Sequence, residues 1–75
     1  MRYRRIRDLR EDFDYKQKYV AQYLNCTQAT YSRIENGDRE LSTEVLIKLS
    51  QLYNVSTDYL LGLSDYPKRI KHNIK

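Results

Sequence analysis

The segment from Gln17 to Gly37, QKYVAQYLNCTQATYSRIENG, limits what this chain can fold into more than any other stretch. Its apolar residues fall into two short blocks at helical spacing. They are Val20, Ala21 and Leu24 in the first block, and Tyr31 and Ile34 in the second. Because residues three or four apart share one face of a helix, each block predicts a short helix with one buried stripe.

The residues between the two blocks, Asn25-Cys26-Thr27, indicate a tight turn. Asparagine is one of the few residues other than glycine that adopt left-handed backbone geometry at small cost. Thr27 can accept a hydrogen bond from a backbone N–H two or three residues further on, and so cap the second helix. The pattern therefore predicts two helices joined by a sharp, capped turn.

The second helix carries small and polar side chains on the face that its apolar stripe leaves free. An amide, a methyl group, a hydroxyl and a guanidinium are expected there, from Gln28, Ala29, Ser32 and Arg33. Groups of these kinds bond to or contact base edges in the major groove of DNA. These residues are therefore the candidate base-reading residues.

The span from about Ile6 to Gly62 resembles the Cro/repressor-type helix-turn-helix domain of phage repressors and bacterial XRE regulators. Three pieces carry the likeness in the right order and spacing: KQKYVAQYLNCTQATYSRIENG, STEVLIKLSQLYNV and VSTDYLLG. Two positions depart from the family pattern, with Asn25 where Gly is usual and Tyr31 where Ile or Val is usual. The resemblance implies an all-α, compact five-helix fold of the lambda-repressor type. It also implies a sequence-specific DNA-binding transcriptional regulator, most simply a repressor.

The flanking sequence supplies the other expected helices. The spacing of Ile6, Leu9 and Phe13 predicts a first helix over residues 3–13, ahead of the motif's own helices, which are expected at 16–24 and 27–34. Ser42 and Ser56 are expected to cap two later helices. The apolar face of the earlier one comprises Val45, Leu46, Leu49, Leu52 and Tyr53, and the later one covers residues 57–61 and ends at Gly62.

Length and composition set further bounds. A chain of 75 residues forms one domain, expected over residues 1–62, and the basic C-terminal segment 63–75 is expected to be a mobile tail or a short additional element. The single cysteine cannot form an internal disulfide, and no apolar run approaches the roughly 20 residues that cross a bilayer. We therefore expect a soluble, cytoplasmic protein with no membrane partner.

Positive charge gathers toward the two ends of the chain. The formal net charge is +4, and the basic residues near the ends are Arg2, Arg4, Arg5, Arg7, Arg10, Lys68, Arg69, Lys71 and Lys75. Two interpretations remain open. The basic ends contact a polyanion such as DNA, or they only keep a small protein soluble.

The resemblance also implies roles outside the base-reading helix. Phosphate contacts are implied for Lys16, Gln17, Thr27, Asn36 and Arg39, although the loop after the motif could also be an ordinary polar loop. A structural pair is implied between Arg10, which lies near the first apolar stripe, and Glu35. A buried arginine is costly unless a carboxylate meets it, so the alternative is a solvated Arg10.

Three tyrosines form a stripe of their own at spacing four, namely Tyr15, Tyr19 and Tyr23. Half-buried packing is the more usual use of such a stripe. A surface for a protein partner is the alternative, since Tyr19 and Tyr23 occupy positions that the family usually fills with charged residues.

One recognition helix reads too few base pairs to specify a genomic site, so we expect a homodimer on a pseudo-palindromic operator of double-stranded DNA. The dimer surface is expected at helix 57–61 with residues 63–75. The alternative function is an antitoxin-like or scaffold protein-binding module that uses the same fold and the tyrosine stripe.

Catalytic and metal-binding patterns do not appear in the sequence. His72 is the only histidine, and there is no cysteine pair, no acidic cluster at ligand spacing, no glycine-rich phosphate loop and no Ser/His/Asp set. We therefore expect no enzymatic activity, no metal and no cofactor.

Overall fold

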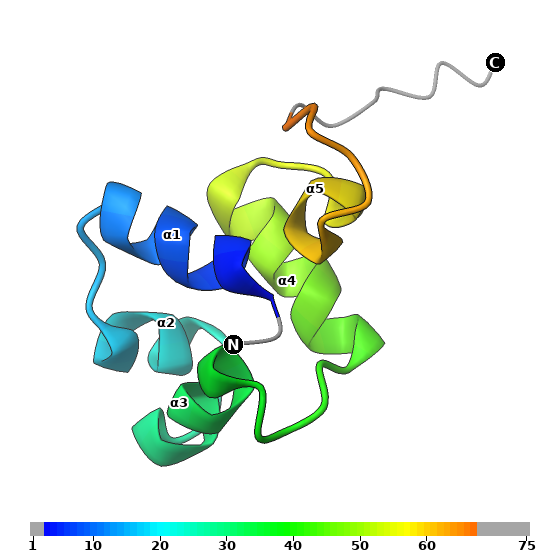
Figure 1. Ribbon diagram of the computed structural model, residues 1–75. Coiled ribbons are helices and arrows are strands. Elements are labelled where there is room, and N and C mark those ends of the chain that lie inside the picture. The colour runs from blue at the N-terminus through cyan, green and yellow to red at the C-terminus, as the bar shows by residue number, and fades with distance from the viewer. Residues whose placement is uncertain (1–2, 68–75) are drawn as a thin grey trace, which may run out of the picture.

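The computed structural model describes residues 3–67 of the chain, and this part is all-helical. Its helices are α1 (Arg4–Asp12), α2 (Gln17–Tyr23), α3 (Gln28–Asn36), α4 (Thr43–Tyr53) and α5 (Thr57–Leu61). Figure 1 shows α2 and α3 below α1, with α4 and α5 to the right of it. The expected all-α, five-helix architecture is confirmed.

The helix ends follow the capping residues that the sequence provides. The side chains of Thr27, Ser42 and Ser56 accept backbone N–H groups at the starts of α3, α4 and α5. Gly37 and Gly62 end α3 and α5 at positive φ of 85° and 79°. Glycine adopts this backbone geometry without strain, so local chemistry sets these boundaries. Helix α3 therefore continues two residues beyond the expected end at residue 34.

Left-handed backbone also appears at residues other than glycine. Asn25, in the turn between α2 and α3, has φ of 61°, and Asn54, after α4, has φ of 55°. Asp14, between α1 and α2, has φ of 61°, which was not expected from the sequence. Asparagine and aspartate tolerate this region better than other side chains, so the turns form without glycine.

The core takes side chains from every helix of the described part. The largest fully buried ones are Ile6, Val20, Tyr31, Leu49 and Leu60, one each from α1 to α5. Because each short helix buries only a narrow stripe, none has a core of its own, and the helices must be stable together. Cys26, a free thiol, is half-buried against this core.

A cluster of aromatic rings lies at the junction of α1, α2 and α4. Phe13 was expected in the buried stripe of the first helix but is 45% exposed. Its ring packs edge-on against Tyr53 at a centroid distance of 5.1 Å, because α1 ends at Asp12 and the chain turns away there. Tyr15 packs between Tyr53 and Tyr19, with its centroid 4.6 Å from that of Tyr19. For Tyr15 and Tyr19, the structure therefore fits the interpretation of the tyrosine stripe as half-buried packing.

The first residues after α5 fold back onto the domain. The Pro67 carbonyl accepts the Ser56 N–H at 2.9 Å, and Arg5 of α1 bonds to Ser64 and Asp65. Residues 63–67 of the expected tail are thus held against α1 and α5. Residues 68–75 lie outside the described residues. Within 3–67, no helix has the length and apolar character needed to cross a membrane.

We expect Tyr53→Phe to leave the free energy of unfolding unchanged or to raise it by up to about 1 kcal/mol. The Tyr53 hydroxyl is buried and has no hydrogen-bond partner among residues 3–67, so its removal relieves a desolvated polar group. Urea denaturation measures the effect. The matched control is Tyr31→Phe, because the Tyr31 hydroxyl donates to Glu35 Oε2 at 2.7 Å. That control should cost about 1.5 to 3 kcal/mol, and equal losses in the two variants would contradict this account.

Candidate nucleic-acid interface

Glu35, near the end of α3, is the centre of a buried polar network. Its carboxylate is only 2% exposed and accepts hydrogen bonds from side chains of other helices. Arg10 of α1 donates through Nε to Oε2 at 2.7 Å and through Nη2 to Oε1 at 3.2 Å. Gln17 of α2 donates through Nε2 to Oε1 at 3.0 Å. Tyr31 of α3 completes the network through its hydroxyl.

The network joins the three helices around the motif. Arg10 is 14% exposed and also donates from Nη1 to the Tyr15 carbonyl at 3.0 Å. The guanidinium therefore bonds both the end of α3 and the connection that leads into α2. A paired arginine fork fixes direction as well as distance, so α3 is held in one orientation relative to α1 and α2.

Ionisation of these groups reflects the same contacts. Burial alone would raise the pKa of Glu35, but hydrogen bonds from Arg10, Tyr31 and Gln17 outweigh burial and hold the pKa below its ordinary value. The hydrogen bond to Glu35 raises the pKa of Arg10 despite partial burial. Burial, and then the bond to the Glu35 carboxylate, raise the pKa of Tyr31. At neutral pH the network is therefore an ion pair with a neutral tyrosine.

The outer face of α3 carries the candidate base-reading residues. Gln28, Ala29 and Arg33 are exposed and Ser32 is half-buried, while Tyr31, Ile34 and Glu35 face inward. Within residues 3–67, neither the Gln28 amide nor the Arg33 guanidinium has a hydrogen-bond or ion-pair partner. These polar groups are therefore available to bond to a ligand.

The candidate phosphate-contacting residues fall into two groups. Lys16, Asn36 and Arg39 are exposed, the first before α2 and the other two at the end of α3 and in the loop after it. Gln17 and Thr27 have side chains already engaged. One amide hydrogen of Gln17 is used by Glu35 and the second remains, whereas the Thr27 hydroxyl donates to Thr30 Oγ1 at 2.9 Å. A contact from that hydroxyl to phosphate would need its proton redirected.

Two contacts of this site were not expected from the sequence. Tyr31 and Glu35 are four residues apart on one helix, and this spacing could have indicated their bond. The contact of Gln17 with Glu35 joins residues on different helices, so no local pattern announces it. Both contacts strengthen the network that orients α3.

Comparison with known proteins gives consistent similarities. Residues 6–60 match the family model described as helix-turn-helix. The chain is 42% identical over 66 residues to the HTH-type transcriptional regulator ImmR of Bacillus subtilis (strain 168), covering 88% of this chain and 52% of that protein. It is 37% identical over 57 residues to the SPbeta prophage-derived uncharacterized HTH-type transcriptional regulator YonR of the same organism, covering 76% of this chain and 53% of that protein. The chain thus spans about half the length of the curated relatives it matches.

A solved structure shares the arrangement of helices. It is the crystal structure of the P22 c2 repressor protein in complex with a synthetic operator, with a TM-score of 0.75 and 26% sequence identity. The match covers 85% of this chain and 97% of that chain. The similarity in fold therefore extends over nearly the whole of the repressor chain.

A double-mutant cycle should show strong coupling between Arg10 and Glu35. Arg10→Ala and Glu35→Ala should each cost on the order of 3 kcal/mol, because each leaves a buried charge without its partner. The double variant should lose clearly less than the sum of the two. Denaturant melts of the four proteins measure the coupling, and additive losses would mean that the pair contributes nothing as a pair.

Acid should weaken the wild-type protein through Glu35. The pKa of Glu35 is lower in the folded state than in the unfolded state, where it is about 4.3. The ionised carboxylate therefore stabilises the fold fully above that unfolded-state value, and this stabilisation is lost as pH falls through the folded-state pKa. The difference in unfolding free energy between wild type and Glu35→Gln should be constant above about pH 5.5 and shrink toward pH 3. Urea melts at several pH values test this, and a gap that stays constant would contradict it.

Proposed function

This chain belongs to the helix-turn-helix family, and we therefore propose that it is a sequence-specific DNA-binding domain of a transcriptional regulator. One observation carries the proposal. Helix α3, oriented by the buried Glu35 network, exposes the Gln28 and Arg33 side chains, which have no partner among residues 3–67. The relatives named as transcriptional regulators and the operator complex of the P22 c2 repressor support the same role. The latter also favours repression over activation.

The proposed mechanism places the start of α3 in the major groove. A glutamine amide can bond adenine N6 and N7 together, and an arginine fork can bond guanine O6 and N7. Gln28 and Arg33 are assigned these roles, with Ala29 and Ser32 in contact beside them. Because the helix is oriented by α1 and α2, the side chains reach base edges in a fixed register.

Phosphate contacts set that register from both sides of α3. Lys16 and Gln17 lie at the start of α2, and Thr27, Asn36 and Arg39 lie at the ends of α3 and in the loop after it. Contacts to phosphate position a protein on the duplex but carry no sequence information directly. In this proposal these five residues supply affinity, and α3 supplies specificity.

A homodimer on a pseudo-palindromic operator completes the proposal. Two copies double the number of base pairs read and place their α3 helices about one helical turn apart. The proposed dimer surface comprises α5 and residues 63–67, where Leu63 is 74% exposed and Tyr66 is 59% exposed. Exposed apolar side chains of this size commonly mark contact surfaces.

The proposal includes a non-catalytic, cytoplasmic role. In the described part of the chain, no group of three or more His, Cys, Asp or Glu side chains is placed to hold a metal ion. A helix-turn-helix regulator acts by occupying DNA, so no reaction or cofactor is needed for the proposed activity.

A second candidate is a protein-binding module on the same fold. Tyr19 is 48% exposed and Tyr23 is 39% exposed, and both lie on α2. These rings could contact a partner protein, as in an antitoxin. The salt dependence of DNA binding separates the two candidates. Each phosphate contact releases counterions, so log K falls by about 0.9 per contacted phosphate for each tenfold rise in salt concentration. A slope near zero would favour the protein-binding module.

Selection of bound sequences from random duplex DNA tests the proposal directly and yields the half-site. With that site in hand, we expect Gln28→Ala and Arg33→Ala each to flatten base preference at particular positions. Each bidentate contact should account for about 1 to 3 kcal/mol of discrimination against a wrong base. Binding to a panel of singly substituted half-sites measures the preference.

The matched control is Arg39→Ala, which removes a cation of the same kind outside α3. It should weaken binding to all sequences equally and lower the salt slope of log K by about 0.9, the value for one phosphate contact. If Gln28→Ala and Arg33→Ala leave the preference profile unchanged, α3 is not the reading helix.

A further inference from the structure

Arg5, on the first turn of α1, makes contacts that the DNA-reading role does not use. Its Nη1 donates to the Tyr59 carbonyl at 3.0 Å and to the Ser64 carbonyl at 2.5 Å. Its Nη2 donates to Asp65 Oδ1 at 2.7 Å. The guanidinium carbon also lies 4.1 Å from the centroid of the Tyr59 ring. One side chain therefore joins α1, α5 and the segment after α5.

We call residues 63–67 the C-terminal strap. The Leu63 N–H donates to the Asp58 carbonyl at 2.9 Å, and the strap ends where the Pro67 carbonyl accepts the Ser56 N–H. Backbone bonds thus fix both ends of the strap, and Arg5 fixes its middle. The strap carries Leu63 and Tyr66, which are among the most exposed large apolar side chains of the described residues.

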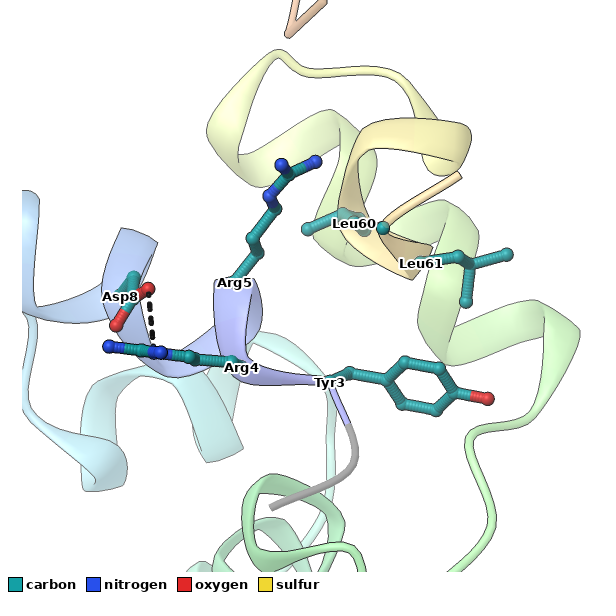
Figure 2. A pocket seen from close by; sticks show the side chains of 7 residues that line it. Tyr3, Arg4, Arg5, Asp8, Leu60 and Leu61 are labelled. Carbon is teal, nitrogen blue, oxygen red and sulfur yellow. Dashed lines mark ion pairs between the residues drawn. The ribbon is translucent and has the colours of Figure 1, made fainter. Parts of the chain in front are cut away.

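Figure 2 shows Arg5 rising from α1 alongside α5, while Arg4 turns the other way to lie against Asp8. Leu60 and Leu61 of α5 and Tyr3 line the same open hollow as Arg5. Leu60 is buried beneath this hollow and Leu61 is partly exposed, so the strap starts beside an apolar side chain of α5 that a partner can reach. This is the surface proposed above for the second copy of the chain.

Helix α1 connects this surface to the reading helix. Arg10, near one end of α1, holds Glu35 of α3, and Arg5, near the other end, holds the strap. In Figure 1, α3 and residues 63–67 lie at opposite ends of the described part of the molecule. The two arginines are five residues apart, or about 7.5 Å along a helix. A single rigid helix thus sets the position of the strap relative to α3.

We propose that Arg5 is a positioning residue for the dimer: by holding the strap against α1 and α5, it fixes the distance and rotation between the two α3 helices, and so the half-site spacing. The inference rests on the proposed function. Inserting one base pair between the half-sites increases their separation by about 3.4 Å and rotates one relative to the other by about 35°. A dimer with a rigid surface loses affinity at the altered spacing, whereas a dimer with a loose surface adjusts and retains it.

The two carbonyl contacts carry more of this role than the ion pair. Asp65 is 98% exposed, and an ion pair with so exposed a partner contributes little in water. The Arg5 guanidinium, in contrast, bonds the Tyr59 and Ser64 carbonyls through Nη1 and also lies over the Tyr59 ring. A lysine ammonium has no planar group to stack on that ring while it bonds both carbonyls. Arg5→Lys should therefore release the strap nearly as well as Arg5→Ala, and Asp65→Asn should release it much less.

The first measurement is amide hydrogen exchange in the full 75-residue chain. The Ser56 N–H bonds to Pro67, so its exchange reports strap opening, while the Leu60 N–H reports α5 itself. Arg5→Ala and Arg5→Lys should speed exchange at Ser56 by about tenfold or more and leave Leu60 protected. The matched control is Arg7→Ala, which removes an exposed arginine of α1 whose one ion-pair partner among the described residues is Glu11.

The second measurement is binding to duplexes whose two selected half-sites are moved apart or together by one or two base pairs. Wild type and Arg7→Ala should prefer one spacing. Arg5→Ala and Arg5→Lys should bind a single half-site as wild type does, but the affinity ratio between the best spacing and its neighbours should fall toward one. This holds whether the dimer loosens or dissociates, since both remove the spacing constraint.

The outcomes separate the two proposals. Unchanged exchange at Ser56 in the Arg5 variants would show that Arg5 does not hold the strap. A released strap with an unchanged spacing preference would show that the strap does not set the dimer geometry, while the DNA-binding proposal stands. If selection with the wild-type protein yields no bound duplex, the proposed function is overturned, and the role of Arg5 in spacing falls with it.

Discussion

The rest of the structure depends on one buried carboxylate. Glu35 is almost wholly withdrawn from water, where an unpaired charge would be too costly to retain. The fold meets this requirement with donors from α1, α2 and α3 itself. Because the carboxylate is satisfied only when these helices are in place, the network favours one orientation of α3 over alternatives that hydrophobic packing alone would tolerate.

Tyr31 shows how one substitution fits this constraint. The family pattern favours Ile or Val at its position, and either would fill the core without a polar atom. Tyrosine fills the same space and brings a hydroxyl, which bonds to Glu35 one turn further along α3. Tyr53 is also buried, but its hydroxyl has no such partner in the described part of the chain. The contrast shows that a buried tyrosine is neither stabilising nor harmful in itself, since its effect depends on what its hydroxyl meets.

Helix α1 links the two ends of the molecule. Its apolar stripe packs Ile6 into the core, and two of its arginines contact segments that are far away in sequence. Arg10 reaches residue 35, and Arg5 reaches residues 59, 64 and 65. These charge-assisted bonds have direction, whereas apolar packing mainly sets distance. A small domain with a thin core thereby gains defined relative positions for its proposed reading helix and its proposed dimer surface.

The sequence by itself determined the helices, their caps and the turn of the motif. These features depend on residues within a few positions of each other, as with Thr27 at the start of α3 and Gly37 at its end. Only the tertiary structure decided the exposure of Phe13, the bond from Gln17 to Glu35 and the return of residues 63–67 to Arg5. Each of these depends on contacts between different helices or between segments distant in sequence. The physical reason is that local propensity fixes backbone geometry, whereas the pairing of distant polar groups depends on how the assembled helices close around them.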